Sequence, residues 1–230
     1  MFNCTTNRYD ALYARWLSKP GALLEQAGYT SGERLLDLCG GSGVVSQEAL
    51  YWGRDIDDPE QNPNVTLLDL NPRVDWFCGL YDSEFHAVRG AAENVGSLFD
   101  ENTFDLVVCR QALAYLDFRK TFPGVARVLR PGGRFVFNYF VHPLDGGVKP
   151  YSTHWYKVGN VQFAEAHLYL KGKVYHLQAR LSHGPGIDIT RFSYHDPEEM
   201  VKVLDDCGFN TVIFRKGRSL RFLCIKREDA

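Results

Sequence analysis

The sequence predicts an α/β fold: a doubly wound, mostly parallel sheet of seven strands that ends in an antiparallel hairpin and carries a small antiparallel β insertion as a lid. Short apolar runs alternate with helix-length segments as far as Tyr139, which is the pattern of βαβ units. After Pro143 the apolar positions alternate with polar ones, as is typical of half-buried antiparallel strands. The β-rich insertion therefore falls between the fifth strand and the last helix.

Five apolar runs account for the parallel strands. They are continuous rather than alternating because the central strands of a parallel sheet are buried on both faces. They cover residues 35–39, 65–69, 85–89, 104–109 and 133–139. Among the helix-length segments between them, residues 44–52 and 118–129 are the clearest.

The insertion and the C-terminal part have their own turn and cap signals. Residues 161–170 and 173–181 flank Lys171-Gly172, a hairpin turn, and residues 187–194 are expected to form a third strand. Asp196 and Pro197 suit the start of a helix. Two last strands, at 211–215 and 220–225, are joined so tightly that they must pair antiparallel at the edge of the sheet.

Composition and charge narrow the class of protein. The chain has 230 residues, 45% of them hydrophobic, and a formal net charge of -2, which gives no electrostatic footprint for nucleic acid or an anionic membrane. No apolar run approaches the roughly 20 residues that span a bilayer. The six cysteines form no Cys-x-x-Cys pair and no signal peptide is evident, which predicts reduced thiols and a cytoplasmic location. The seven histidines show no metal-ligand spacing.

The richest segment is a strand that runs into a glycine-rich turn and then directly into a helix. Gly41 and Gly43 allow a sharp turn and a close approach of the backbone to a ligand. By itself, Gly41-Ser42-Gly43 only half-matches the dinucleotide pattern. Asp37 separates the two cases, because a carboxylate before the turn would repel a pyrophosphate and suits a cationic group such as the ammonium of S-adenosylmethionine (SAM).

A second acid follows the same logic. Asp69 ends the second strand, where a carboxylate can accept hydrogen bonds from ribose hydroxyls. The fold brings Asp69 to the same rim of the sheet as the glycine turn, so the two features support each other. A role as a helix cap or turn former is the structural alternative for Asp69.

Four stretches in order resemble the motifs of class I SAM-dependent methyltransferases, of the small-molecule type that includes the ubiquinone/menaquinone methyltransferase-like and sugar-amine N-methyltransferase enzymes. They are LDLCGGSG at 36–43, RGAAENV at 89–95, FDLVVCRQAL at 104–113 and VLRPGGRF at 128–135. The resemblance implies a single SAM-binding methyltransferase domain over residues 1–230. Within it, an N-terminal helical lid covers 1–30 and a β-rich substrate-side insertion covers 143–194.

The resemblance also assigns cofactor roles. Cys39 stands at the usual first glycine, and Ala91 replaces the aspartate that holds the adenine amino group, which leaves that contact to the backbone of Ala91 and Ala92. The backbone of Arg110 would face the methionine moiety, and Tyr9 would fold over the cofactor near its carboxylate. The predicted cofactor-binding residues are Asp37, Gly41, Gly43, Asp69, Leu70, Ala91, Ala92, Arg110 and Tyr9.

The acceptor side is predicted from an aromatic cluster after the fifth strand. Methyl transfer is an in-line displacement, so the enzyme mainly aligns a nucleophile and needs a base only if that nucleophile must lose a proton. His142 is the first candidate base and His154 the second. The candidate substrate-binding residues are Tyr139, Trp155, Tyr156 and, from the N-terminal segment, Tyr13. Packing of the lid is the competing explanation for each of them.

The leading hypothesis is transfer of a methyl group from SAM to N or O of a small molecule, with secondary metabolites among the acceptors considered. The alternative is a SAM-binding protein of the same fold with a non-methylating catalytic or regulatory role, which Ala91 and the lack of an evident base leave open. A nicotinamide-dependent oxidoreductase is a third hypothesis, which Asp37 and the terminal hairpin oppose. We expect no metal, no nucleic-acid or membrane partner, and a monomer or homodimer.

Overall fold

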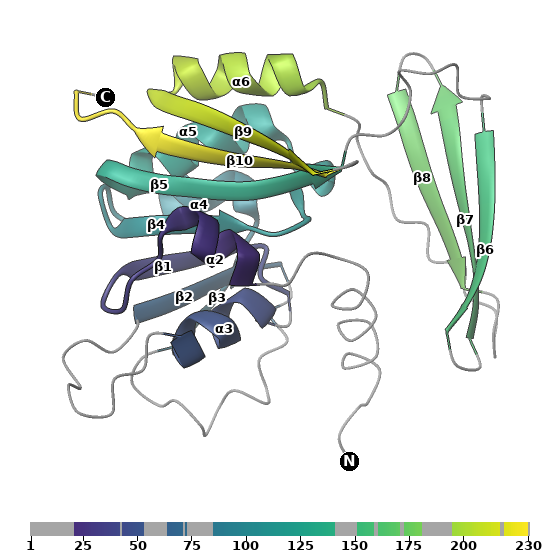
Figure 1. Cartoon of the computed structure of the whole chain (residues 1–230), viewed down its shortest axis with the longest axis horizontal. Coiled ribbons are helices and arrows are strands. Elements are labelled where there is room, and N and C mark those ends of the chain that lie inside the picture. The colour runs from purple at the N-terminus through teal and green to yellow at the C-terminus, as the bar shows by residue number, and fades with distance from the viewer. Residues whose placement is uncertain are drawn as a thin grey trace.

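The computed structural model describes residues 21–41, 43–52, 64–70, 72, 85–140, 151–158, 161–170, 173–180, 195–216 and 219–229. Its main element is a seven-stranded sheet with the order β3-β2-β1-β4-β5-β10-β9 (Figure 1). The strands are β1 (Arg34–Leu38), β2 (Asn64–Asp69), β3 (Phe85–Arg89), β4 (Phe104–Cys109), β5 (Leu129–Phe140), β9 (Phe209–Lys216) and β10 (Ser219–Lys226). The first five pair in parallel, and β10 pairs antiparallel with both β5 and β9. The predicted fold class is confirmed.

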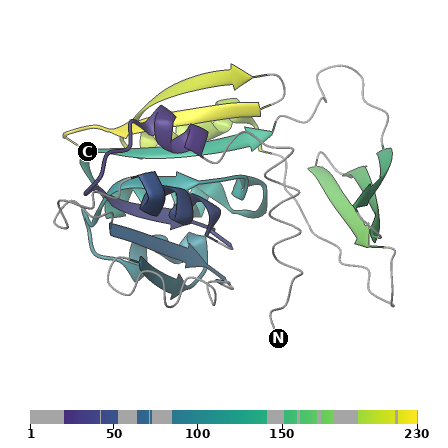
Figure 2. The same cartoon turned by 60° about the horizontal axis from the view of Figure 1, so that its bottom comes forward.

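Helices cover both faces of this sheet, as Figures 1 and 2 show. On one face lie α2 (Gly21–Ala27) and α3 (Val44–Trp52); on the other lie α4 (Val95–Leu98), α5 (Phe118–Val128) and α6 (Pro197–Asp206). Two short 3-10 helices, η2 (Ala92–Asn94) and η3 (Leu113–Tyr115), follow β3 and β4. The sheet is therefore the middle of three layers, which is the doubly wound arrangement.

The core forms two clusters because successive residues of each central strand point to opposite faces. In β1, Leu36 and Leu38 belong to the cluster under α5 and α6, whereas Leu35 belongs to the cluster under α2 and α3. All three side chains are fully buried. The continuous apolar runs read from the sequence are thus explained by burial on both faces.

A separate three-stranded antiparallel sheet forms the insertion. Its strands are β6 (Tyr151–Val158), β7 (Val161–Leu170) and β8 (Lys173–Arg180), in that order, and they lie between β5 and α6 in the chain. The predicted β7–β8 hairpin is confirmed. The third strand comes from 151–158, a segment that the sequence analysis interpreted only as an aromatic cluster, while the strand expected at 187–194 lies outside the described residues.

The start of β5 differs from the sequence prediction. The expected strand begins at Gly133, but the observed one begins at Leu129 and includes the Pro131-Gly132-Gly133 turn. Gly132 has a φ of 70°, and the pairing of β5 with β4 shifts register between Phe104 and Leu106. A bulge of this kind extends a strand through residues that would otherwise form a turn.

The cap predicted for the last helix is confirmed. The Asp196 side chain accepts a hydrogen bond from the backbone N–H of Glu198 at 3.0 Å, and Pro197 occupies the first turn of α6. Gly208, with a φ of 88°, follows the helix before β9 begins. The chain thus re-enters the main sheet on a helix whose start is fixed by its own side chains.

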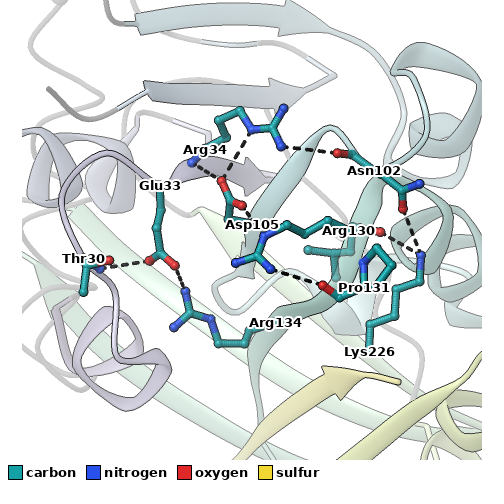
Figure 3. A network of polar contacts seen from close by, with 10 residues as sticks. Thr30, Glu33, Arg34, Asn102, Asp105, Arg130, Pro131, Arg134 and Lys226 are labelled. Carbon is teal, nitrogen blue, oxygen red and sulfur yellow. Dashed lines mark hydrogen bonds and ion pairs between the residues drawn. The ribbon is translucent and has the colours of Figure 1, made fainter. Parts of the chain in front are cut away.

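At the amino ends of the parallel strands, ion pairs and hydrogen bonds tie the strands together (Figure 3). Asp105, at the start of β4, accepts from the Arg34 backbone N–H at 2.7 Å and pairs with the Arg130 side chain. Arg134 pairs with Glu33 in the same region. The Lys226 ammonium donates to the Leu129 carbonyl at 2.8 Å and to the Asn102 side chain at 3.3 Å. In this network each acid has cationic or N–H partners.

Candidate active site

The opposite ends of the same strands surround a cavity of about 410 Å³. In doubly wound sheets the carboxyl edge of the parallel strands is where ligands bind, and the volume is within the usual range for small-molecule sites. The lining residues come from the ends of β1, β2, β3 and β4, from η2 and η3 and the residues beside them, and from the start of α3. They are Asp37, Cys39, Gly40, Gly41, Val44, Val45, Asp69, Leu70, Gly90, Ala92, Glu93, Arg110, Gln111, Ala112, Tyr115 and Leu116.

The turn after β1 forms the floor of this cavity. Cys39 and Gly41 both have left-handed backbone conformations, with φ values of 58° and 56°. The Cys39 N–H donates to the Leu68 carbonyl at 2.7 Å, so the turn is fastened to β2. A Cβ on Gly40 would lie 2.7 Å from Leu67 Cγ and 2.8 Å from Asp37 Cγ. The floor can therefore be this close to Asp37 only because residue 40 has no side chain.

Asp37 is the buried acid of the site, with 1% of its surface exposed. Its Oδ2 accepts from the Ser46 backbone N–H at 3.0 Å and from the Ser46 hydroxyl at 2.7 Å. Its Oδ1 is buried without a hydrogen-bond partner among the described residues. Burial raises the pKa of Asp37 to about 6, although the Ser46 hydrogen bonds and the positive charge of Arg110 act in the opposite direction. One oxygen thus holds α3, and the other is an acceptor that a ligand can fill.

Asp69 stands at the end of β2, next to the glycine turn. Its Oδ2 accepts from the Gly41 N–H at 3.0 Å, which confirms that the fold brings the two features together. Leu70 follows on the rim with 67% of its surface exposed. An exposed leucine beside a carboxylate offers an apolar surface and a hydrogen-bond acceptor to the same ligand.

The wall on the β3 side is built mainly from backbone. Ala92 is buried, begins η2 and lines the cavity, whereas Ala91 is the extended residue before it, with a φ of -78° and a ψ of 140°. Glu93 also lines this wall, and its Oε1 accepts from the Asp117 N–H at 3.1 Å. That bond ties the β3 wall to the start of α5.

On the β4 side the cavity wall includes Arg110, whose side chain is the only cationic one among the described lining residues. Its charge counteracts the rise in pKa that burial causes at Asp37 and at Glu48, which lies on α3. The next residue, Gln111, has a φ of 58°, and its N–H donates to Asn138 Oδ1 at 2.8 Å. Asn138 lies near the end of β5 and is only 1% exposed.

These residues fit SAM. Among the described lining residues there are three acids, Asp37, Asp69 and Glu93, and one arginine, so this lining favours a ligand with net positive charge. The unpartnered Asp37 Oδ1 suits an ammonium, reached directly or through water, and Arg110 suits a carboxylate. A dinucleotide would bring a pyrophosphate next to these acids, which is unfavourable.

The structure brings together six of the predicted cofactor residues as cavity lining: Asp37, Gly41, Asp69, Leu70, Ala92 and Arg110. Gly43 is buried beside the cavity, and its N–H donates to the Gly40 carbonyl at 2.8 Å. Ala91 lies between two lining residues. Their contacts with a cofactor remain predictions.

The predicted acceptor residues are placed differently. Tyr139 is buried in the core, 4% exposed, and its hydroxyl accepts from the His195 N–H at 2.7 Å, so it lies outside the cavity lining. His154, Trp155 and Tyr156 are on β6, at register positions opposite Glu165, Ala164 and Phe163 of β7. Tyr9, Tyr13 and His142 lie outside the described residues.

Sequence reasoning missed Glu93, Gln111 and Tyr115 as lining residues. Glu93 and Gln111 lie within two of the stretches that resemble motifs, at positions to which the resemblance assigns no role. No sequence signal marks Gln111 as a residue with a left-handed backbone, so its positive φ could not be predicted. Among the described residues no group of His, Cys, Asp and Glu could hold a metal ion.

The sequence from residue 36 to residue 137 matches a protein-family model described as a methyltransferase domain. Residues 36–137, a little less than half of the chain, therefore match a methyltransferase domain. The match covers every cavity-lining element, from the turn after β1 to the loop after β4. No helix in the described part of the chain is long and apolar enough to cross a membrane.

Two curated relatives differ in how much of their length aligns with this chain. An uncharacterized protein of Methanocaldococcus jannaschii is 34% identical over 117 residues, which cover 49% of this chain and 39% of that protein. The demethylmenaquinone methyltransferase of Tropheryma whipplei is 23% identical over 229 residues, which cover 94% of this chain and 84% of that protein. The shared part of the first relative is thus less than half of its length.

Solved structures repeat the fold over nearly the whole chain. A SAM-dependent methyltransferase from Clostridium acetobutylicum superposes with a TM-score of 0.70, at 15% identity, over 98% of this chain and 100% of that one. A SAM-bound amino pentose methyltransferase from Micromonospora echinaspora gives a TM-score of 0.68, at 17% identity and 97% coverage of both chains. The fold predicted from the sequence is confirmed, and residues 36–137 match the predicted family of methyltransferases. SAM is the cofactor that the cavity fits.

Proposed function

We propose that the methyltransferase transfers the methyl group of SAM to a nitrogen or oxygen atom of a small molecule. The observation that carries this proposal is the acid-lined cavity in which a fully buried carboxyl group, Asp37, keeps one oxygen without a hydrogen-bond partner among the described residues. When bound, SAM supplies a methyl group already activated by its sulfonium.

In this proposal the cofactor extends across both sides of the cavity, with its methionine part on one side and its ribose and adenine on the other. Asp37 and Arg110 hold the ammonium and carboxylate of the methionine part, at the ends of β1 and β4. Asp69 accepts hydrogen bonds from the ribose hydroxyls at the end of β2. Leu70 and the Ala91–Ala92 backbone contact the adenine, since residue 91 offers no carboxylate for its amino group.

A small-molecule acceptor is supported by the insertion and by charge. The chain leaves the main sheet at the carboxyl end of β5, the edge that holds the cavity, and returns at α6 after three antiparallel strands. Inserted elements at this edge commonly shape the pocket for a substrate. The formal net charge of -2 does not favour nucleic acid. A solved neighbour acts on an amino pentose and a relative on demethylmenaquinone. Both acceptors are small molecules, which supports this part of the proposal.

Several finer assignments stay predictions. His142 and then His154 are the candidate bases for an acceptor that must lose a proton, with Trp155, Tyr156 and Tyr13 beside the acceptor and Tyr9 over the cofactor. We retain the boundaries 1–30 for the N-terminal lid and 143–194 for the insertion. A cytoplasmic location and a monomeric or homodimeric state belong to the same proposal.

The test is incubation of the purified protein with SAM labelled in its methyl group and a panel of amines, phenols and hydroquinones. The proposal expects label in an organic product and an equal amount of S-adenosylhomocysteine (SAH). Binding of SAM without transfer to any acceptor would favour the non-methylating alternative. Failure to bind SAM or SAH would contradict the proposal as a whole.

A further inference from the structure

Gln111 combines several unusual features at one point of the cavity wall. It lines the cavity directly after β4, and its φ of 58° places a non-glycine residue in the left-handed region. Its side-chain Nε2 is buried and has no hydrogen-bond partner among the described residues. Strained backbone and unfilled buried donors both cost free energy, and both occur preferentially at functional sites.

The strain at Gln111 is held by a second residue. Asn138, 1% exposed near the end of β5, accepts the Gln111 N–H through its Oδ1 at 2.8 Å. That bond joins the loop after β4 to the neighbouring strand of the sheet. Asn138 therefore holds the backbone of Gln111 in its left-handed conformation, which determines the direction in which the side chain leaves the backbone.

The position of Gln111 separates it from the cofactor contacts. In the strand order β3-β2-β1-β4-β5, the predicted ribose and adenine contacts belong to the β2 and β3 side. Asp37 and Arg110, at the ends of β1 and β4, fit the methionine end. Gln111 follows Arg110 and is hydrogen-bonded to Asn138 of β5, so it belongs to the β4 and β5 side. The chain also departs into the insertion from the end of β5. The atom that receives the methyl group must approach the methionine end from a side that the cofactor leaves open, and Gln111 is on that side.

We propose that Gln111 binds the methyl acceptor, by donating from its side-chain amide to an oxygen atom next to the methylated atom, and that Asn138 is the positioning residue that holds it there. The inference rests on the proposed function and narrows the substrate class to acceptors with a hydroxyl or carbonyl oxygen beside the nucleophile. The amide nitrogen provides two N–H donors, and the acceptor oxygen would fill at least one of them.

The test measures SAH affinity by calorimetry and labelled methyl transfer in parallel, for wild type and five variants. The acceptors are two matched pairs, 2-aminocyclohexanol with cyclohexylamine and catechol with phenol. Gln111→Leu and Gln111→Glu remove the N–H donors. Asn138→Leu removes the acceptor of the Gln111 N–H. The control is Gln26→Leu, because Gln26 on α2 also has a buried Nε2 without a described partner but lies outside the cavity lining.

We expect wild type to favour, in at least one pair, the member with a hydroxyl group next to the atom that is methylated, which is 2-aminocyclohexanol or catechol. Gln111→Leu and Gln111→Glu should lose about 10-fold or more in kcat/KM for that member, with SAH affinity within about 3-fold of wild type. Asn138→Leu should reduce the same preference and Asn138→Asp, which keeps the acceptor oxygen, should restore it. Gln26→Leu should behave as wild type.

Two sets of results separate this inference from the proposed function. Absence of SAH binding in wild type would overturn both. Normal SAH binding with no preference for 2-aminocyclohexanol or catechol, or with no transfer to either, would overturn the role of Gln111 alone. The same holds if Gln111→Leu and Gln111→Glu keep the wild-type preference, or if they lose SAH affinity as strongly as they lose transfer.

Discussion

The two ends of the same parallel strands differ in how fully the chain itself supplies partners for their buried acids. At the amino ends, Asp105 is surrounded by the Arg34 N–H and the Arg34 and Arg130 side chains. At the carboxyl ends, Asp37 is more deeply buried and yet has one oxygen without a partner among the described residues. At the amino ends the described chain itself supplies partners for Asp105, whereas at the carboxyl ends it leaves one Asp37 oxygen to which a ligand can donate.

The pKa values of the two acids show the same difference. Burial alone would raise the pKa of Asp105, but the hydrogen bonds and charges of Arg34 and Arg130 outweigh it and hold the pKa below its usual value. Burial raises the pKa of Asp37 to about 6 in spite of Ser46 and Arg110. Asp105 therefore adds stability above about pH 4 that is lost as the pH falls further, whereas Asp37 costs stability as the pH rises from about 4 to 6. An acid that destabilises the fold at neutral pH is one that a cationic ligand can stabilise.

The largest effect is expected from a pair of crowded glycines, one at each end. A Cβ on Gly40 would lie 2.7 Å from Leu67 Cγ, and a Cβ on Gly133 would lie 2.8 Å from the Arg130 carbonyl oxygen. Gly40→Ala and Gly133→Ala should each lower the free energy of unfolding by about 1–3 kcal/mol. Only Gly40→Ala should also weaken SAH binding, by about 100-fold, because it moves the floor of the cavity. Denaturant unfolding measures the free energy of unfolding, and calorimetry measures the SAH affinity. An equal loss of affinity in both variants would contradict the assignment of ligand binding to the carboxyl ends alone.

The next effect concerns the amino ends alone. Asp105→Ala leaves the Arg34 N–H and the Arg130 side chain without their acceptor, so the free energy of unfolding should fall by about 2 kcal/mol. The affinity for SAH should stay within about 2-fold of wild type. Arg119→Ala is a suitable control, since Arg119 and Glu199 form an exposed ion pair and such pairs contribute less than about 1 kcal/mol. A large loss of SAH affinity in Asp105→Ala would show that the two ends are coupled.

The pH dependence of binding sharpens the comparison. Above its pKa of about 6, the Asp37 carboxylate attracts the ammonium of SAH; as the pH falls through 6 the carboxyl is neutralised. Affinity should then fall by up to about 10-fold per pH unit. Glu48, whose pKa burial raises to about 7, also interacts with Arg110, so Asp37→Asn is the control. A profile from pH 5 to 8 in which Asp37→Asn keeps the wild-type slope would assign the dependence to another group.

The smallest effect is expected at Cys39. This residue has a φ of 58°, a conformation that costs most residues about 1–2 kcal/mol and glycine very little. After subtracting the greater flexibility of glycine in the unfolded chain, Cys39→Gly should raise the free energy of unfolding by about 0.5 kcal/mol. SAH affinity should change by less than about 3-fold. A loss of stability would show that the Cys39 side chain contributes more by packing than its backbone costs.

The sequence predicted the carboxyl ends better than the amino ends. Glycine turns and strand-terminal acids such as Asp37 and Asp69 are local patterns, and parallel strands always bring them to one edge. The Asp105 network was not predicted, because Arg34 and Arg130 meet Asp105 only after β1, β4 and β5 have paired. Gln111 and Asn138 were missed for the same reason, since the bond between them spans two strands. Patterns within one segment are readable, and contacts that depend on the register between segments are not.

Calorimetric titration of SAH at pH 8 into wild type, Asp37→Asn and Asp105→Asn tests the difference between the two ends most directly. Both variants replace a carboxylate by an amide of the same shape. Wild type and Asp105→Asn should bind one SAH per chain with the same affinity, and Asp37→Asn should bind about 10- to 100-fold more weakly, as expected for a lost charge-assisted hydrogen bond. Equal affinity of Asp37→Asn and wild type, or no binding of SAH to wild type, would contradict the assignment of Asp37 to the ammonium group of the cofactor.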